Sequence, residues 1–242
     1  MALKIDLNYS PNFYSIKRKP KQIKFLIFHY TGMKKESEAI KKLTSIKSDV
    51  SSHYFIKNNG EIILMVPDLY IAWHAGKSSW KNFKSLNKYS IGIEINNPGH
   101  QFKYKKYSSK QINSILSLSK FLIKRYKIKK ENILGHSDIS PNRKKDPGEK
   151  FPWKYLSKKK ISHWHDLDEK KLLHERNKKV SELDKKTFIQ NLIRIGYSKQ
   201  VRKKNLKLII KNFQRRFRQK LINGLIDKEC LLISKKLLKK FK

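Results

Sequence analysis

Residues 133–153 read ILGHSDISPNRKKDPGEKFPW, the most informative part of this chain. The segment begins as a short apolar strand ending at His136, continues through a polar loop with Lys144 and Asp146, and closes on an aromatic FPW sequence. A histidine and a carboxylate placed on a strand end and an adjoining loop can face one metal ion. A catalytic zinc site needs three protein ligands and an open fourth position. A third ligand must therefore come from elsewhere in the chain.

The candidate for that ligand is His29. It follows the apolar run Lys24–Phe28, which is rich in strand formers and predicts a buried strand. The abrupt change to His-Tyr-Thr-Gly at its end is typical of the place where α/β proteins carry functional side chains. A lone histidine at a strand end is more often structural, so its assignment depends on the residues that join it.

Strands and helices alternate through the first two thirds of the chain and predict an α/β domain. The apolar spacing indicates two amphipathic helices, and the Asn58-Asn59-Gly60 turn indicates a β-hairpin, whose first strand holds His53 in a role we expect to be structural. The expected elements are helices 36–47 and 109–126, hairpin strands 52–56 and 61–66, and a strand at 90–96.

Glu94 is unusual because it stands among isoleucines and a glycine in the sequence SIGIEIN, residues 90–96. A carboxylate on a buried strand is unfavourable unless it is paired or its shifted pKa is useful. The alternative is a glutamate on a solvated sheet face. Trp73, His74 and Trp80 lie in a region rich in Gly, Ser and Asn, which favours a groove wall over a core.

The chemistry of these residues is complementary. His29, His136 and Asp146 offer two imidazoles and one carboxylate, and they leave a fourth tetrahedral position for water. Glu94 is suited to act as the general base for that water. Lys144, two residues before Asp146, can stabilise the oxyanion of a tetrahedral intermediate. The set predicts metal-assisted hydrolysis of an amide.

After Trp153 the composition changes. Residues 157–184 are dense in charge and predict a basic linker, in which His163 and His165 are expected to be surface residues. Apolar spacing returns from Lys185 and predicts a small module of three helices, with Asp227 as an N-cap. One face of this module is basic and fits nucleic acid or carboxylates equally; it carries Arg215, Arg216 and Arg218.

The chain of 242 residues has a formal net charge of +39, from 58 Lys and Arg against 19 Asp and Glu. Such a charge indicates an acidic partner or a lysine-rich, AT-biased coding sequence. Cys230 is the single cysteine, which excludes an internal disulfide and a cysteine-based zinc site. We find no transmembrane segment and no signal peptide. We therefore expect a cytoplasmic protein if the chain is complete, and a periplasmic or cell-envelope protein if it is a mature form.

The motifs FHYT (28–31), SSHY (51–54), AWHAG (72–76), SIGIE (90–94), GHSDI (135–139) and RKKDPG (143–148) resemble, in this order, the zinc-dependent N-acetylmuramoyl-L-alanine amidases of the AmpD/AmiD type. The resemblance implies a central mixed β-sheet flanked by helices. It implies one Zn²⁺ held by His29, His136 and Asp146, with Glu94 and Lys144 as the catalytic pair. It also implies a substrate groove that is lined by Trp73, His74 and Asn87.

The resemblance further implies a substrate, peptidoglycan or its muropeptides, cleaved between N-acetylmuramic acid (or its anhydro form) and L-alanine. FQRRFR (213–218) and NGLID (223–227) resemble a three-helix peptidoglycan-binding domain. The expected organisation is an N-terminal arm (1–21), a zinc amidase domain (22–156), a basic linker (157–184) and a helical peptidoglycan-binding-like domain (185–242).

Two other functions compete with this one. A non-catalytic peptidoglycan-recognition protein typically lacks a zinc ligand, whereas this chain keeps all three together with Glu94 and Lys144. A nucleic-acid-binding protein accounts for the charge but offers no reason for the His/His/Asp set. We therefore expect no specific nucleic-acid partner, and we expect a monomer.

Overall fold

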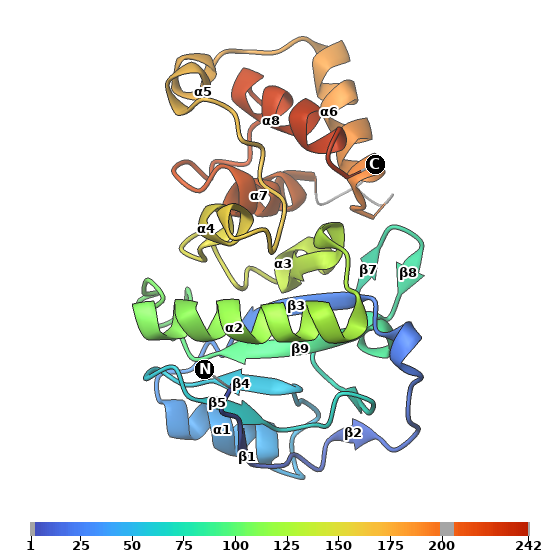
Figure 1. Ribbon diagram of the computed structural model, residues 1–242. Coiled ribbons are helices and arrows are strands. Elements are labelled where there is room, and N and C mark those ends of the chain that lie inside the picture. The colour runs from blue at the N-terminus through green and yellow to red at the C-terminus, as the bar shows by residue number, and fades with distance from the viewer. Residues whose placement is uncertain (1–2, 199–205, 242) are drawn as a thin grey trace.

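The computed structural model describes residues 3–198 and 206–241 of the chain. Within these residues, six strands form a mixed sheet in the order β1-β5-β4-β9-β3-β10, which confirms the predicted fold class (Figure 1). In this sheet β4 and β5 pair antiparallel and the other neighbours pair parallel. Its strands are β1 (Asp6–Leu7), β3 (Phe25–Tyr30), β4 (Tyr54–Ile56), β5 (Ile62–Leu64), β9 (Ser90–Ile95) and β10 (Ile133–Gly135).

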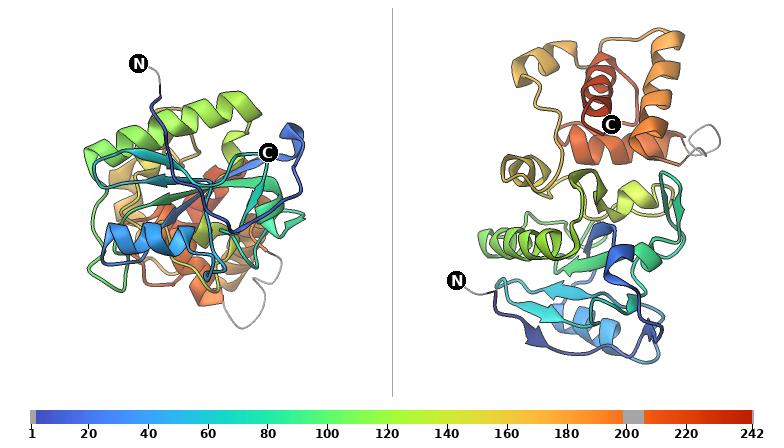
Figure 2. Two further views of the ribbon diagram at one scale, coloured as in Figure 1. Left: turned by 90° about the horizontal axis from the view of Figure 1, so that it is seen from below. Right: turned by 45° about the vertical axis from the view of Figure 1, so that its right-hand side comes forward.

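Two helices cover opposite faces of this sheet, α1 (Glu36–Thr44) and α2 (Ser109–Tyr126), as Figure 2 shows from below. Side chains alternate between the two faces of a strand. Phe55 accordingly packs with the α1 residues Ala39 and Leu43, whereas its neighbours in β4 belong to the larger core that includes α2. The predicted hairpin is confirmed as β4 and β5.

The register of the parallel strands gathers polar residues at one edge of the sheet. His29 on β3 pairs with Glu94 on β9, so both side chains point to the same face. Gly135 on β10 pairs with Phe28, so the chain delivers His136 beside His29. His136 then begins the short helix α3 (His136–Ile139). Candidate residues far apart in the sequence thereby meet at the carboxyl ends of three adjacent strands.

Short elements complete this part of the molecule. The N-terminal arm contributes β1 to the sheet edge and β2 (Phe13–Tyr14), which pairs antiparallel with β6 (Ile71–Ala72). A second small hairpin joins β7 (Ser79–Trp80) to β8 (Phe83–Lys84). Three 3-10 helices are η1 (Pro20–Gln22), η2 (Leu86–Tyr89) and η3 (Lys130–Asn132).

The C-terminal helices stack at one end of the α/β part, next to α3 and the β7–β8 hairpin (Figures 1 and 2). The three predicted helices are present, and the side chain of Asp227 accepts a hydrogen bond from the backbone of Cys230, as expected of an N-cap. These three are α6 (Glu182–Ile195), α7 (Leu206–Phe217) and α8 (Lys228–Leu238). Two shorter helices precede them, α4 (Trp153–Lys158) and α5 (Glu169–Glu175).

The segment 157–184 differs from the solvated linker that its charge suggested. It contains α5, and its apolar side chains Ile161, Trp164 and Leu172 are buried in the main core. His165 is also buried, with 4% of its surface exposed, so its predicted surface position is wrong. Lysines dominate the composition of this segment, but its apolar side chains, which follow no helical period, pack into the core.

Trp80 is a core residue, so its predicted place in a groove wall is wrong. Only 1% of its surface is exposed, and its ring packs edge-on against Tyr197 at 4.9 Å. A Cβ on Gly196 would lie 2.4 Å from this ring, so the glycine makes the close packing possible. The covering residues come from the end of α6, more than a hundred positions later in the chain.

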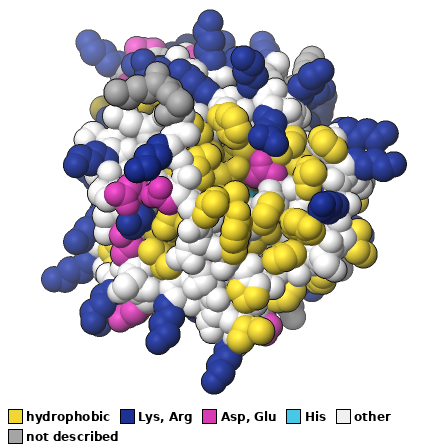
Figure 3. Space-filling model, turned by 60° about the horizontal axis from the view of Figure 1, so that its bottom comes forward, with side chains coloured by type: hydrophobic (Ala, Val, Ile, Leu, Met, Phe, Trp, Pro, Cys, Tyr) yellow, Lys and Arg dark blue, Asp and Glu magenta, His cyan; other side chains and the backbone are white. Residues whose placement is uncertain are grey.

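The surface reflects the charge of the chain. Figure 3 shows a face on which hydrophobic side chains gather in the middle while lysine and arginine side chains stand around the edge. The N-terminal arm contributes large exposed apolar side chains, among them Leu7, Tyr14 and Ile16. Among the described residues, no helix is long and apolar enough to cross a membrane.

Candidate metal centre

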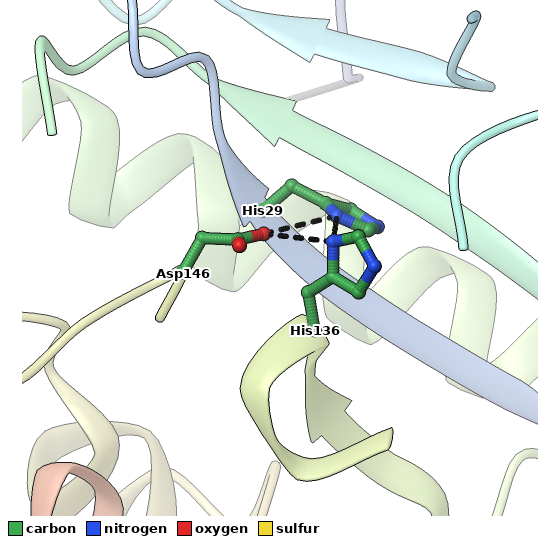
Figure 4. Close-up of side chains that lie close together, drawn as sticks. All are labelled: His29, His136 and Asp146. Atoms are coloured by element: carbon green, nitrogen blue, oxygen red, sulfur yellow. Dashed lines mark hydrogen bonds and ion pairs between the residues drawn. The ribbon is translucent and has the colours of Figure 1, made fainter. Parts of the chain in front are cut away.

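Three predicted ligands converge in the structure. His29 and His136 turn their Nδ1 atoms toward each other at 2.9 Å, and an oxygen of Asp146 lies 3.2 Å and 3.0 Å from them (Figure 4). All three side chains are buried, with exposed fractions of 1%, 3% and 6%. Among the described residues, this is the group of histidine, cysteine and acidic side chains that could hold a metal ion.

The tautomer of His29 follows from two residues behind it. The Ser90 hydroxyl donates to the backbone oxygen of Leu86 at 2.6 Å, so its oxygen accepts from Nε2–H of His74 at 3.1 Å. Burial holds the pKa of His74 well below its usual range, so this ring is neutral and its Nδ1 is an acceptor. His74 Nδ1 therefore accepts from Nε2–H of His29 at 3.0 Å. Nδ1 of His29 is left with a free electron pair.

The same reasoning holds for His136. Its Nε2–H donates to the backbone oxygen of Ala75 at 3.2 Å, so in the neutral ring Nδ1 is the atom that carries the free electron pair. Burial, together with the nearby His136, lowers the pKa of His29 to about 4, so that ring is neutral at physiological pH. The two Nδ1 atoms and an oxygen of Asp146 therefore face one another as candidate ligands of one metal ion.

Glu94 lies beside this group. It is partly buried, and one of its carboxylate oxygens is buried without a hydrogen-bond partner among the described residues. Burial, followed by the negative charge of Asp146, raises the pKa of Glu94 to about 8, while Lys144 and Lys42 oppose the rise. A carboxyl group with a pKa near neutrality can take up and release protons in a reaction at physiological pH.

A cleft of about 380 Å³ contains these residues, which is a volume typical of small-ligand sites. Trp73 and Lys144 line both this cleft and an adjoining cavity, so the two form one groove beside the ligands. Nε1 of Trp73 is buried without a hydrogen-bond partner among the described residues. Cations border the cleft: Lys42, Arg143, Lys144 and Lys145.

The other two predicted groove residues have additional contacts. His74 is 8% exposed and lies mainly behind the candidate metal ligand His29, which it contacts directly. The Asn87 side-chain oxygen accepts from the backbone nitrogens of His74 and Ala75, so it also shapes the groove wall. His53 is fully buried and hydrogen-bonded to the Gly92 nitrogen, in the structural role expected of it.

Sequence reasoning missed the residues that support the ligands. Ser90 fixes His74, and Gly92 provides its space, because a Cβ there would lie 2.4 Å from the His74 ring. Tyr30 and His100 also line the cleft, and the Tyr30 hydroxyl lies 2.8 Å from Nδ1 of His100. A glycine between two isoleucines in a strand was the one available signal, since glycine there often marks a close approach.

Comparisons with known proteins agree with this geometry. The family model described as N-acetylmuramoyl-L-alanine amidase matches residues 19–149. The chain is 36% identical over 234 residues to N-acetylmuramoyl-L-alanine amidase AmiD of Escherichia coli (strain K12), covering 91% of this chain and 84% of the relative. It is 41% identical over 110 residues to 1,6-anhydro-N-acetylmuramyl-L-alanine amidase AmpD of Haemophilus influenzae, covering 45% of this chain and 58% of that protein.

Two solved structures are similar over most of the chain. One is E. coli AmiD in complex with anhydro-N-acetylmuramic acid-L-Ala-D-γ-Glu-L-Lys, with a TM-score of 0.80, 34% identity and 90% of each chain covered. The other is AmpDh3 from Pseudomonas aeruginosa in complex with an anhydromuramic pentapeptide, with a TM-score of 0.79, 29% identity and 99% of each chain covered. Both similarities extend beyond the α/β part into the C-terminal helices.

Proposed function

This chain belongs to the N-acetylmuramoyl-L-alanine amidase family, and from that premise we propose which of its residues perform the reaction. The protein hydrolyses the amide bond between N-acetylmuramic acid, or its anhydro form, and the L-alanine of a peptidoglycan stem peptide. The observation that most strongly supports the residue assignment is the convergence of His29, His136 and Asp146 next to a cleft that Glu94 and Lys144 line.

We propose that the metal is one zinc ion held by His29, His136 and Asp146. Two nitrogens and one oxygen suit zinc, and ligand atoms around a tetrahedral zinc ion lie about 3.3 Å apart for bonds of about 2.0–2.1 Å. The three atoms here are 2.9–3.2 Å apart, which fits. When bound, the ion supplies a Lewis acid that polarises the amide carbonyl and lowers the pKa of water.

Glu94 is the proposed general base, and in its ionised form it takes the proton from the attacking water. It then delivers that proton to the leaving nitrogen of L-alanine, which its raised pKa favours. Lys144 lines the same cleft, and its ammonium group is proposed to stabilise the oxyanion of the tetrahedral intermediate. Glu94 and Lys144 line the same cleft, so both groups can face one substrate.

We assign substrate binding to Trp73, His74 and Asn87, which line the groove beside the ligands. Trp73 lines both parts of the groove, whereas His74 and Asn87 act mainly by fixing the groove wall. The cations at the cleft border suit the carboxylates of a stem peptide. This gives the positive charge of the chain a use without a nucleic-acid partner.

The domain organisation is proposed as 22–156 for catalysis, 157–184 as the connecting segment and 185–242 as the peptidoglycan-binding-like part. One copy of the chain carries the full set of ligands, together with Glu94 and Lys144, so we propose that the active species is a monomer. Sedimentation of the active protein at assay concentration checks the oligomeric state.

Mass spectrometry of a purified soluble anhydro-muropeptide tests the function. We expect the wild type to release free stem peptide, a chelator to stop the reaction, and added zinc to restore it. Glu94→Gln keeps the size of the side chain but removes the base, so we expect kcat to fall by about 10²–10⁴-fold. Glu61→Gln, at an exposed glutamate outside the cleft, is the matched control.

The outcomes separate the two readings of the site. Release that depends on zinc and on Glu94 supports the assignment, with Glu61→Gln at wild-type activity. Intact muropeptide under all conditions, with bound zinc measured in the same sample, contradicts it and leaves a recognition protein.

A further inference from the structure

Helix α7 of the C-terminal part contacts the loop that carries Lys144. The Asn212 side chain is 1% exposed, and its amide nitrogen donates to the backbone oxygens of Pro141 at 2.8 Å and Lys144 at 3.1 Å. Its side-chain oxygen accepts from Arg215 at 2.6 Å. Both donor bonds of this amide therefore end on the catalytic loop, 68 and 71 positions earlier in the chain.

Two side chains also tie this loop to the segment before β7: Arg143 donates to the backbone oxygens of Ala75 and Lys77, and the Ser140 hydroxyl donates to the oxygen of Lys77. Asn142, Arg143 and Lys145 are exposed, so burial of apolar side chains does not hold this part of the backbone. The Lys144 nitrogen donates to the Ser140 oxygen at 3.0 Å, which closes a turn but does not fix that turn to the rest of the molecule. Asn212 adds a connection to the C-terminal part and bonds the backbone of Lys144 itself, because its two bonds tie the Lys144 and Pro141 carbonyls to α7.

A second route leads from α7 to the rim of the cleft. Nε of Arg215 lies 3.7 Å from a carboxylate oxygen of Glu149, and that oxygen is 3.0 Å from Nε2 of His100. Nδ1 of His100 is 2.8 Å from the hydroxyl of Tyr30, the residue next to His29. Arg215 donates a hydrogen bond to the Asn212 side chain, so two linked residues of α7 connect it to the surroundings of the cleft.

The predicted basic face of this module is turned inward. Arg216 pairs with Asp138 and Arg218 pairs with Asp227, and both arginines are at most 3% exposed. Arg215 is also largely covered, with 12% of its side chain exposed. The sequence-based expectation that these arginines bind an external polyanion is therefore wrong. Their charges hold the module together and fasten it to the catalytic part.

We propose that α7 is part of the active-site scaffold and that Asn212 is a positioning residue, which holds the catalytic loop so that the Lys144 ammonium group faces the scissile carbonyl. The inference rests on the proposed role of Lys144 in hydrolysis. It adds that the C-terminal helices affect the hydrolysis of every substrate, including soluble muropeptides, and do not serve only to dock the protein to the intact wall.

Steady-state kinetics of the full-length zinc-loaded protein on a soluble anhydro-muropeptide test this inference. Asn212→Ala is expected to lower kcat by about 10–100-fold, because small misplacements of a catalytic group have effects of this size. KM is expected to stay within about twofold, since the groove residues are untouched. Asn212→Asp keeps the shape of the side chain and the acceptor for Arg215 but loses the donor. It should lower kcat in the same way, and it serves as the test if the alanine variant does not fold.

The matched control is Asn191→Ala on α6. Asn191 is 5% exposed and donates to the Ser234 hydroxyl inside the module, without contact to the loop. It should lower the melting temperature as Asn212→Ala does and leave kcat unchanged. An equal fall of kcat in both variants would mean that general loosening of the module is responsible, and it would overturn the assignment of Asn212.

A double-mutant cycle with Lys144→Ala provides the decisive readout. If Asn212 acts through Lys144, Asn212→Ala has no further effect on kcat once Lys144 is removed, whereas independent effects multiply. An unreactive wild type defeats the proposed function itself. The inference alone is defeated if the wild type is active and Lys144→Ala is slow, but kcat is unchanged in both Asn212 variants. It is also defeated if the effects of Asn212→Ala and Lys144→Ala multiply in the cycle.

Discussion

At the scale of single residues, the hydrogen-bond partners of the histidine rings determine which ring nitrogen carries a proton. The Ser90 hydroxyl has its own acceptor in the Leu86 carbonyl, and this fixes His74 and then His29 in turn. Ala75 does the same for His136. These contacts orient both imidazoles toward Asp146. Ser90, which is linked to His29 through His74, thereby influences which nitrogen of His29 can bind a metal ion.

Glu94 gives a pH prediction at the same scale. Its pKa is raised from an ordinary 4.5 to about 8 in the folded chain, mainly by burial. Below pH 4.5 both folded and unfolded chains hold the proton; above it the unfolded chain loses the proton first, so stability falls as pH rises toward about 8. Glu94→Gln cannot ionise. In chelator-treated protein it should therefore melt above wild type at pH 8 and match wild type near pH 4.

The melting temperatures of both proteins between pH 4 and pH 8 check this. Glu61→Gln is the control, because the exposed Glu61 pairs with Lys57 and its pKa is lowered by that contact. That variant should show no gain at pH 8. A constant difference between Glu94→Gln and wild type across the range would contradict the raised pKa.

At the scale of elements, β9 combines three functions in six residues. Ser90 supports His74, Gly92 leaves space for the His74 ring, and Glu94 points into the cleft beside the ligands. The intervening Ile91, Ile93 and Ile95 are fully buried and hold the strand in the core. This alternation explains why a strand with a glycine and a glutamate still forms the centre of the sheet.

Gly92→Ala tests this arrangement. The new Cβ would lie 2.4 Å from the His74 ring, which must then move away from His29. We expect a lower melting temperature and a zinc affinity weaker by about 10–100-fold, as for lost partners of metal ligands. In a His74→Ala background the space is open, so the same substitution should be neutral or slightly stabilising. Calorimetry and chelator competition on the four proteins measure both effects; equal losses in the two backgrounds would refute the steric explanation.

At the scale of the whole molecule, a buried ion pair joins the helical part to the catalytic part. Arg216 of α7 pairs with Asp138 of α3 and donates to the Ile133 oxygen at 3.0 Å, while the Tyr197 hydroxyl donates to the other carboxylate oxygen of Asp138 at 2.9 Å. The guanidinium group also lies 4.3 Å from the centre of the Trp153 ring. The helix that begins at His136 is therefore supported by residues from the far end of the chain.

Removing one member of this pair should destabilise the entire protein. Arg216→Ala leaves the carboxylate of Asp138 buried without its cation, and we expect the free energy of unfolding to fall by about 3–5 kcal/mol. Arg194→Ala on the exposed surface of α6 should change it by no more than about 0.5 kcal/mol. Urea unfolding followed by circular dichroism compares the two. Similar midpoints for both variants would show that the parts are stabilised independently.

Local pattern was sufficient for much of the fold. The strand ending at His29, the hairpin, the long helix before His136 and the C-terminal helices follow from apolar spacing and turn residues, which depend on neighbours a few positions away. The candidate site was also foreseeable in part. Histidine, aspartate and glutamate at the ends of predicted strands are unusual there, and parallel strands bring their ends to one edge.

The sequence by itself therefore determined the elements of this protein and the residue types that gather at the candidate metal centre. Only the tertiary structure decided which polar groups are partners. Arg216 and Asp138 are 78 positions apart, and Asn212 and Lys144 are 68 apart, so no periodicity reveals either contact. Trp80 and the segment 157–184 were misjudged for the same reason. Whether a charged or aromatic side chain meets water or protein depends on what the remainder of the chain packs against it.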